Sequence, residues 1–169
     1  HLLMKEVTDA YESYNVTDAT RPIQAFVERL SNWYVRLSRR RFWKSESDAD
    51  KQGAYATLYE CLVTLSKLIA PAMPFLSEAL YRNLVVEVDA TAPESVHLSM
   101  WPEANESLID MQRIKSMQLI QQLVSLGLAA RNNVLEPITG KKTVIGVRQP
   151  LAHAQFVLRE ESEAQVVTD

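Results

Sequence analysis

The spacing of apolar residues is the feature that most constrains this fold. Apolar side chains recur every three or four residues in five segments of the chain: 2–14, 18–42, 49–69, 74–85 and 108–133. This period places them on one face of an α-helix, so each segment is expected to be an amphipathic helix. Because the connections between the segments are short, we predict a mainly α fold, an antiparallel bundle of about five helices.

The composition supports a helical chain without cross-links. Four glycines and seven prolines among 169 residues leave little room for β-turns. The single cysteine, Cys61, lies in an apolar helical segment, so we expect a buried inert thiol and no disulfide framework. The three histidines are far apart in sequence, and we predict no metal site. No apolar run is long enough to cross a bilayer and no signal segment is present, so a cytoplasmic location is expected.

Capping residues and prolines predict where the helices begin. Thr17 or Asp18 is expected to cap the second helix, and Pro22 to delay its effective start or to kink it. Ser45 or Ser47 is expected to cap the third helix.

The part of the chain after the fourth helix is less regular. Trp101 is expected to anchor an extended strap that crosses the bundle. We predict that the bundle occupies 1–134 and that 135–169 is a C-terminal appendage, the start of a longer C-terminal region. The appendage is expected to contain short strands over 142–147 and 155–158.

A basic segment is the strongest functional signal in the sequence. Between residues 29 and 44 there are six basic residues and no acid, in a chain of formal net charge -3. On an uninterrupted α-helix the apolar residues of this region share one arc, Ile23, Phe26, Val27, Leu30, Tyr34 and Leu37. Arginines and tryptophans alternate along a second arc. Guanidinium groups match phosphate oxygens and aromatic planes stack on unpaired bases, so this second arc is predicted to bind RNA. The candidate residues are Arg29, Trp33, Arg36, Arg39, Arg40, Trp43 and Lys44.

Structural explanations of the same residues stay open at this point. Arginines on a helix face are commonly solvated, and Trp33 would be half-buried if it packed on a neighbouring helix. The acids that follow, Glu46, Asp48 and Asp50, are available to pair with the arginines. Arg41 projects toward the apolar arc, so it is not among the candidates.

The sequence contains no catalytic constellation. A phosphate-cradling glycine loop, a serine-centred elbow and an HExxH motif are all absent. We therefore expect a monomeric binding domain that needs no cofactor. The chain starts at His1 without an initiator methionine, and we expect it to be a piece of a longer protein.

Five sequence blocks occur in a specific order and spacing. They are LSNWYVRLSRRRFWKS, DKQGAYATLYECL, LIAPAMPFLSEALYRNL, ESVHL with a following tryptophan–proline pair, and VRQPL. Over residues 7–151 this series resembles isoleucyl-tRNA synthetases, which are class I aminoacyl-tRNA synthetases. The resemblance implies the helical anticodon-binding bundle that follows the catalytic domain, with tRNA bound at the candidate residues. The HIGH and KMSKS signatures of the catalytic domain are not found in this chain.

The resemblance also implies an activity and partners for a longer parent protein. That protein would activate isoleucine with ATP and Mg²⁺ and attach it to isoleucine tRNA, whereas this piece alone would be non-catalytic. Its partners would be isoleucine tRNA and the catalytic and editing domains of the parent chain, with no membrane.

Two alternatives are kept open by the sequence. One is the matching domain of a valyl- or leucyl-tRNA synthetase, against which the SRRRFWKS and VRQPL blocks argue. The other comes from a different class of protein: a helical interaction module whose basic face binds an acidic protein.

Overall fold

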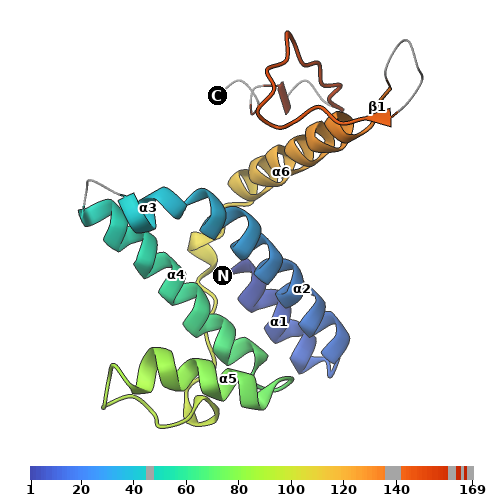
Figure 1. The fold of residues 1–169 in the computed structure, drawn as a ribbon. Helices are drawn as coiled ribbons and strands as arrows, with labels where there is room; N and C mark the ends of the chain where they lie inside the picture. Colours follow the sequence, from blue (N-terminus) through green and yellow to red (C-terminus); the bar gives the residue numbers. More distant parts are fainter. Residues whose placement is uncertain (45–47, 136–141, 160–162, 165, 167–169) are drawn as a thin grey trace. The chain divides into compact units, whose positions relative to one another are not determined.

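The computed structural model describes residues 1–44, 48–135, 142–159, 163, 164 and 166, and these residues are mainly helical (Figure 1). The predicted fold class, a helical bundle, is confirmed. The chain forms two compact units, His1–Ile109 and Asp110–Asp169. Within the described ranges, no helix has the length and apolar character needed to cross a membrane.

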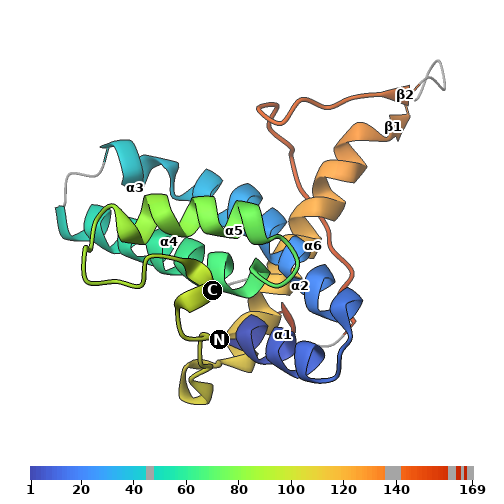
Figure 2. The same cartoon turned by 90° about the horizontal axis from the view of Figure 1, so that it is seen from below.

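The first unit is built from α-helices that two π-helical turns extend. The α-helices are α1 Leu2–Glu12, α2 Val16–Arg29, α3 Arg39–Lys44, α4 Asp48–Ile69 and α5 Pro74–Tyr81. The π-helical turns are η1 Leu30–Val35, after α2, and η2 Arg82–Val86, after α5. Two 3-10 turns follow, η3 Val96–Leu98 and η4 Glu106–Leu108. Helices α1 and α2 lie side by side, and α5 packs against α4 (Figure 2).

The turn between α1 and α2 corrects two expectations. The side chain of Asn15 accepts a hydrogen bond from the backbone N–H of Asp18 at 3.1 Å, so Asn15 caps α2 in place of Thr17 or Asp18. Tyr14 has a φ of 57°, in the left-handed region. Its side chain is 94% exposed, and α1 ends at Glu12, so the first helix is shorter than the predicted segment 2–14.

Pro22 lies inside α2, which begins at Val16. The expected later start of this helix is therefore wrong. Proline lacks an N–H, so the carbonyl of Asp18 loses its helical donor. Residues on both sides of the proline, Ala19 and Ile23, are nevertheless buried, and this burial supports the helix through the interruption.

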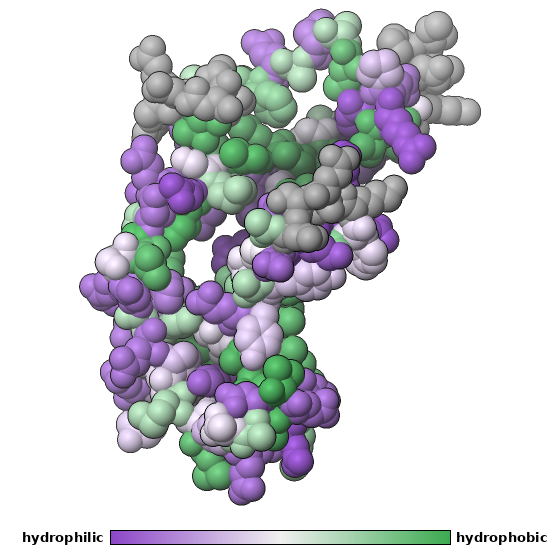
Figure 3. Space-filling model, turned by 90° about the vertical axis from the view of Figure 1, so that its left-hand side faces the viewer, coloured by the Kyte–Doolittle hydropathy of each residue, from purple (hydrophilic) through white to green (hydrophobic). Residues whose placement is uncertain are grey.

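The core of the first unit forms where α1, α2 and α4 meet. Its buried residues are Val7, Ala10, Ala19, Ile23, Leu65 and Leu68. Cys61 in α4 is only partly buried, which corrects the expectation of full burial, and desolvation raises the pKa of its thiol. Apolar residues are also interspersed with hydrophilic ones on the face drawn in Figure 3, as is usual for protein surfaces. A single exposed apolar side chain is therefore not informative in this protein.

Trp101 anchors the segment after α5, as predicted. Its Nε1–H donates to Thr8 Oγ1 at 2.8 Å, and its ring meets Tyr11 edge-on with 5.8 Å between the centroids. The segment is not fully extended, because residues 96–98 form the η3 turn and Val96 is buried. His97, in the same turn, is exposed.

A carboxylate of α5 fixes the same segment. Glu78 Oε2 accepts hydrogen bonds from Ser95 Oγ at 2.8 Å and from the Val96 N–H at 3.0 Å. These bonds favour the charged form, and the pKa of Glu78 is lowered below its ordinary value, with the Ser95 bond as the largest cause.

We expect acid to weaken this attachment. The pKa of Glu78 is lower in the folded chain, so its contribution to stability is complete above the unfolded value of 4.5 and is lost as the pH falls through the folded value. Glu78→Gln should therefore lower the free energy of unfolding at about pH 6 and flatten its dependence on pH toward about pH 3. Urea unfolding followed by circular dichroism measures both effects. Glu94→Gln, which removes an exposed carboxylate from the same region, is the matched control, and equal pH dependence in the two variants would contradict the prediction.

The second unit consists of a long helix and a small hairpin. The helix α6 spans Met111–Asn132, which confirms the helix predicted over 108–133. Asp110 caps it by accepting a hydrogen bond from the N–H of Arg113 at 2.9 Å. Strands β1 Val134–Leu135 and β2 Lys142–Thr143 pair antiparallel, with Val134 opposite Thr143.

The chain after β2 is tied to the end of α6 by Arg131. Its guanidinium donates to the carbonyl oxygens of Gly146 at 2.7 Å and Gln149 at 3.0 Å. The strand expected over 142–147 is thus limited to β2, and the strand expected over 155–158 is wrong. The carbonyl groups of Gly146 and Gln149 lie in irregular backbone. The Arg131 side chain is their hydrogen-bond partner there, in place of a neighbouring strand.

The second unit begins at Asp110, before α6. The sequence instead divides the chain into a bundle over 1–134 and an appendage over 135–169. That functional division stays a prediction. The caps expected at Ser45 and Ser47 lie outside the described residues.

Candidate nucleic-acid interface

A π-helical turn divides the basic helical segment. The turn η1 follows α2 directly, and the N–H of Arg36 donates to the carbonyl of Ser31, the i−5 pattern of a π-helix. Helical hydrogen bonding continues beyond it, from Ser38 N–H to Tyr34 O at 2.9 Å and from Phe42 N–H to Ser38 O at 3.2 Å. The segment is therefore one helical run that contains an inserted turn.

The inserted turn changes which residues face the core. A π turn adds about one residue, which rotates the following part by about 100° relative to an uninterrupted α-helix. Ser38 and Phe42 are accordingly buried, whereas Leu37 is 69% exposed. The predicted apolar arc is right for Ile23 but wrong for Leu37, and also for the exposed Val27.

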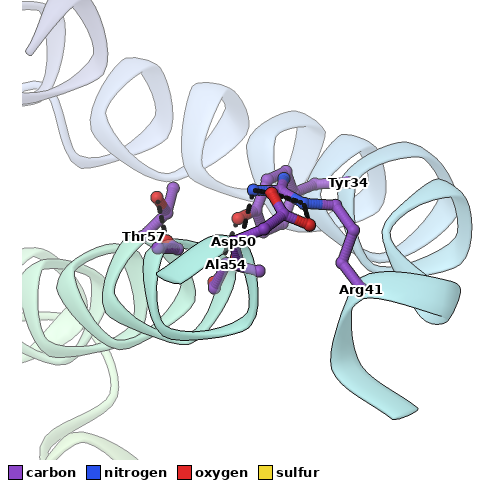
Figure 4. A network of polar contacts seen from close by, with 6 residues as sticks. Tyr34, Arg41, Asp50, Ala54 and Thr57 are labelled. Atoms are coloured by element: carbon purple, nitrogen blue, oxygen red, sulfur yellow. Dashed lines mark hydrogen bonds and ion pairs between the residues drawn. The ribbon is translucent and has the colours of Figure 1, made fainter. Parts of the chain in front are cut away.

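Phe42 and Tyr34 attach this helical run to α4. The ring of Phe42 lies edge-on to Tyr34 at 6.3 Å and 5.1 Å from the ring centre of Tyr55. The hydroxyl of Tyr34 donates to the carbonyl oxygen of Ala54 at 3.0 Å (Figure 4). These contacts hold the run to α4 within the inserted turn and after it.

Arg41 has a structural partner and is set apart from the other arginines. Its Nε lies 2.9 Å and 3.1 Å from the two carboxylate oxygens of Asp50, and the pair is drawn in Figure 4. The hydrogen bond to Asp50 raises the pKa of the Arg41 guanidinium. The expectation that an acid near the start of α4 pairs with the basic segment is met by Asp50. The sequence contained a signal that Arg41 is structural: on the helical projection it points toward the apolar arc, so it was not counted among the RNA-binding candidates.

Four candidate residues form an exposed group at α3, which we call the arginine–tryptophan face. Its members are Arg36, Arg39, Arg40 and Trp43. The three arginines are exposed, and the ring of Trp43 meets that of the buried Phe42 edge-on, with 6.4 Å between the centroids. The indole of Trp43 is 70% exposed, and the guanidinium of Arg39 lies over it, 5.6 Å from the ring centre.

The remaining candidates are separated from this face. Arg29 ends α2 and is exposed, and Trp33 lies within η1 and is partly buried. Arg29 precedes η1 and Trp33 lies within it, so these two residues do not continue the arginine–tryptophan face as a single straight stripe. Lys44 ends α3, and its side chain lies outside the described part of the structure. Whether each residue contacts RNA stays a prediction.

The arginine–tryptophan face concentrates positive charge. Arg36 and Arg40 are four residues apart on a helix, a spacing at which like charges repel by a few tenths of a kcal/mol. Across the described chain, the ion pairs involve Lys5, Arg41 and Arg113, so the three arginines of the face have no acidic partner. A polyanion such as RNA would supply the missing negative charge.

Comparison with known proteins identifies the family of this fold. Residues 1–145 match the family described as the anticodon-binding domain of tRNA ligase. The chain belongs to this family. The match to the anticodon-binding domain includes the whole first unit together with α6, β1 and β2.

Curated relatives of this anticodon-binding domain are isoleucine–tRNA ligases. One from Dehalococcoides mccartyi (strain CBDB1) is 50% identical over 161 residues, which cover 95% of this chain and 15% of the relative. One from Clostridium acetobutylicum is 51% identical over 130 residues, which cover 77% of this chain and 13% of the relative. One from Thermus thermophilus is 49% identical over 130 residues, which cover 76% of this chain and 12% of the relative. The chain thus spans a small part of these relatives, and its resemblance to isoleucyl-tRNA synthetases is confirmed.

Proposed function

We propose that this anticodon-binding domain holds the anticodon arm of isoleucine tRNA as part of a longer isoleucine–tRNA ligase. The observation that carries the proposal is the exposed arginine–tryptophan face, in a domain 50% identical to the matching part of an isoleucine–tRNA ligase. Anticodon loops present unpaired bases between phosphates, and this face offers a partner for each.

Different side chains of the arginine–tryptophan face would contact the phosphates and the bases of the RNA. Arg36 and Arg40 are exposed and have no acidic partner within the described residues, so their guanidinium groups are available to phosphates. Trp43 presents an exposed ring on which a base stacks, and Arg39 holds one side of that ring. Arg29, Trp33 and Lys44 extend the contact along the anticodon arm.

The longer protein would carry the chemistry. It would activate isoleucine with ATP and Mg²⁺ and transfer it to isoleucine tRNA, using catalytic and editing domains of the same chain. We expect it to be cytoplasmic and this domain to be a monomer without its own catalytic activity. Isoleucine-dependent exchange of pyrophosphate into ATP by the purified chain would contradict this division of labour.

The direct test is the affinity of the purified chain for isoleucine tRNA as a function of salt. Contact with about four phosphates of a largely single-stranded loop predicts a slope of log K against log salt of roughly -3. Binding should be weak, because the complete enzyme also holds the acceptor end and so binds tRNA at two places. Equal competition by tRNA and by unrelated acidic polymers would instead support the protein-interaction module.

A second prediction separates stacking from charge. Trp43→Ala is expected to reduce the free energy of binding isoleucine tRNA by about 1–3 kcal/mol, because it removes a stacking surface. The salt slope should change little, since no phosphate contact is lost. Binding isotherms at several salt concentrations measure both quantities. A reduced slope with unchanged affinity at low salt would show that the ring does not stack.

A further inference from the structure

The C-terminal part of the sequence contains a second concentration of positive charge. Residues 111–159 include seven basic residues and one acid, Glu136, in a chain whose formal net charge is -3. The basic residues are Arg113, Lys115, Arg131, Lys141, Lys142, Arg148 and Arg159. A region with such an excess of basic residues attracts polyanions.

Arg131 fixes the backbone of one turn within this basic region. Its guanidinium donates to the carbonyl oxygens of Gly146 at 2.7 Å and Gln149 at 3.0 Å. The N–H of Gln149 donates to the carbonyl oxygen of Gly146 at 2.9 Å, which closes the turn. The N–H of Ile145 donates to the carbonyl oxygen of Arg131, also at 2.9 Å. These hydrogen bonds hold residues 145–149 at the C-terminal end of α6.

The side chains of this turn are exposed although its backbone is fixed. Val147 is 74% exposed, and Arg148 and Gln149 are exposed as well. The ion pairs of the described residues do not include Arg148. The fixed backbone therefore does not serve to bury the side chains of the turn. Ordered loops that expose polar side chains are typical of binding sites.

We propose that Arg148 binds a backbone phosphate of isoleucine tRNA, at a contact additional to the arginine–tryptophan face. The inference rests on the proposed function, in which this chain binds that tRNA. The turn lies beyond residues 1–145, which match the anticodon-binding domain family, so the family match gives it no role. A guanidinium presents parallel N–H donors that fit two oxygens of one phosphate.

Arg131 is a positioning residue for this contact. One terminal nitrogen of its guanidinium donates to both carbonyl oxygens of the turn, so it acts on the RNA through the conformation of Arg148. A turn that is already ordered loses little backbone entropy when RNA binds. The basic residues spread over 111–159 favour a phosphate of a polyanion over a single protein carboxylate.

The affinity of the 169-residue chain for isoleucine tRNA tests the contact. Arg148→Gln is expected to weaken binding about tenfold, through the loss of a charged hydrogen bond. The slope of log K against log salt should become less steep by about 0.7, since one phosphate contact is lost. Filter binding across a salt series measures both, with the fold checked by circular dichroism. Unchanged affinity and slope would overturn the proposal.

Arg113→Gln is the matched control. It removes one exposed charge from the same unit, but Arg113 precedes Arg131 by about 27 Å along α6. Screening in about 0.1 M salt limits the effect of exposed charges to about 10 Å, so binding should change only slightly. Equal losses in Arg148→Gln and Arg113→Gln would overturn the proposal, because the total charge of the unit would then govern binding.

A double-mutant cycle tests the positioning role of Arg131. Arg131→Gln is expected to weaken tRNA binding about fivefold in the unmodified chain, because the turn loses its fixed conformation. It should have little further effect in a chain that already carries Arg148→Gln. A general loss of stability would lower the affinity by the same factor in both backgrounds, and that result would overturn the positioning role.

An acidic protein is the competing partner for this turn. If Arg148→Gln weakened the binding of poly-glutamate and left the binding of tRNA unchanged, the turn would be a protein contact and the proposal would be overturned. Failure of the proposed function would instead appear as absent tRNA binding by the unmodified chain.

Discussion

Replacing Phe42 with alanine is expected to lower the free energy of unfolding by about 3–5 kcal/mol. The ring is 5% exposed and lies against Tyr34 and Tyr55, so its removal leaves a cavity between α3 and α4. The loss should also weaken tRNA binding, because α3 carries the arginine–tryptophan face. Urea unfolding followed by circular dichroism measures the stability.

Leu37→Ala is the matched control for this prediction. On an uninterrupted α-helix Leu37 would face the core, whereas the inserted turn η1 leaves it 69% exposed. Its replacement should cost less than about 1 kcal/mol, as for surface positions. A large loss for Leu37→Ala together with a small loss for Phe42→Ala would mean that the helix is not interrupted.

The helices were predictable because their signal is local. Apolar residues three and four apart mark each helix, and α4, α5 and α6 were found within a few residues of their ends. The inserted turn at Leu30–Val35 could not be predicted in this way, because it depends on contacts with α4. In the folded chain Tyr34 contacts Ala54 and Phe42 contacts Tyr55 with the inserted turn in place. Burial in the folded chain therefore decides the register.

The candidate site was predictable in composition but not in arrangement. Six basic residues without an acid between 29 and 44 indicate an anion-binding surface from sequence alone. Which arginine is structural depends on Asp50, an exposed acid on the next helix that meets Arg41. The turn η1 sets the arginine–tryptophan face apart from Arg29, which precedes the turn, and from Trp33, which lies within it. A helical projection at a constant angle per residue cannot show this change of register.

The double variant Arg36→Glu, Arg40→Glu is expected to bind isoleucine tRNA about 100-fold more weakly in about 0.1 M salt. Hydrogen bonds to charged groups contribute about 1.5–3 kcal/mol each, and about 1.4 kcal/mol corresponds to a factor of ten in affinity. Loss of two phosphate contacts should also make the slope of log K against log salt less steep by about 1.4. Both arginines are exposed and have no acidic partner among the described residues, so the fold should survive the change. Filter binding across a salt series measures affinity and slope together.

The variant Arg21→Glu, Arg82→Glu separates local contact from net charge. It changes the charge of the chain by the same amount, and both residues are exposed, in α2 and η2, away from α3. Screening in about 0.1 M salt limits the effect of exposed charges to about 10 Å, so these distant reversals should change the affinity for tRNA only slightly. Equal losses in the two double variants would mean that total charge governs binding. Full binding by a correctly folded Arg36→Glu, Arg40→Glu variant would show that the arginine–tryptophan face is solvated surface and that the anticodon arm binds elsewhere on the domain.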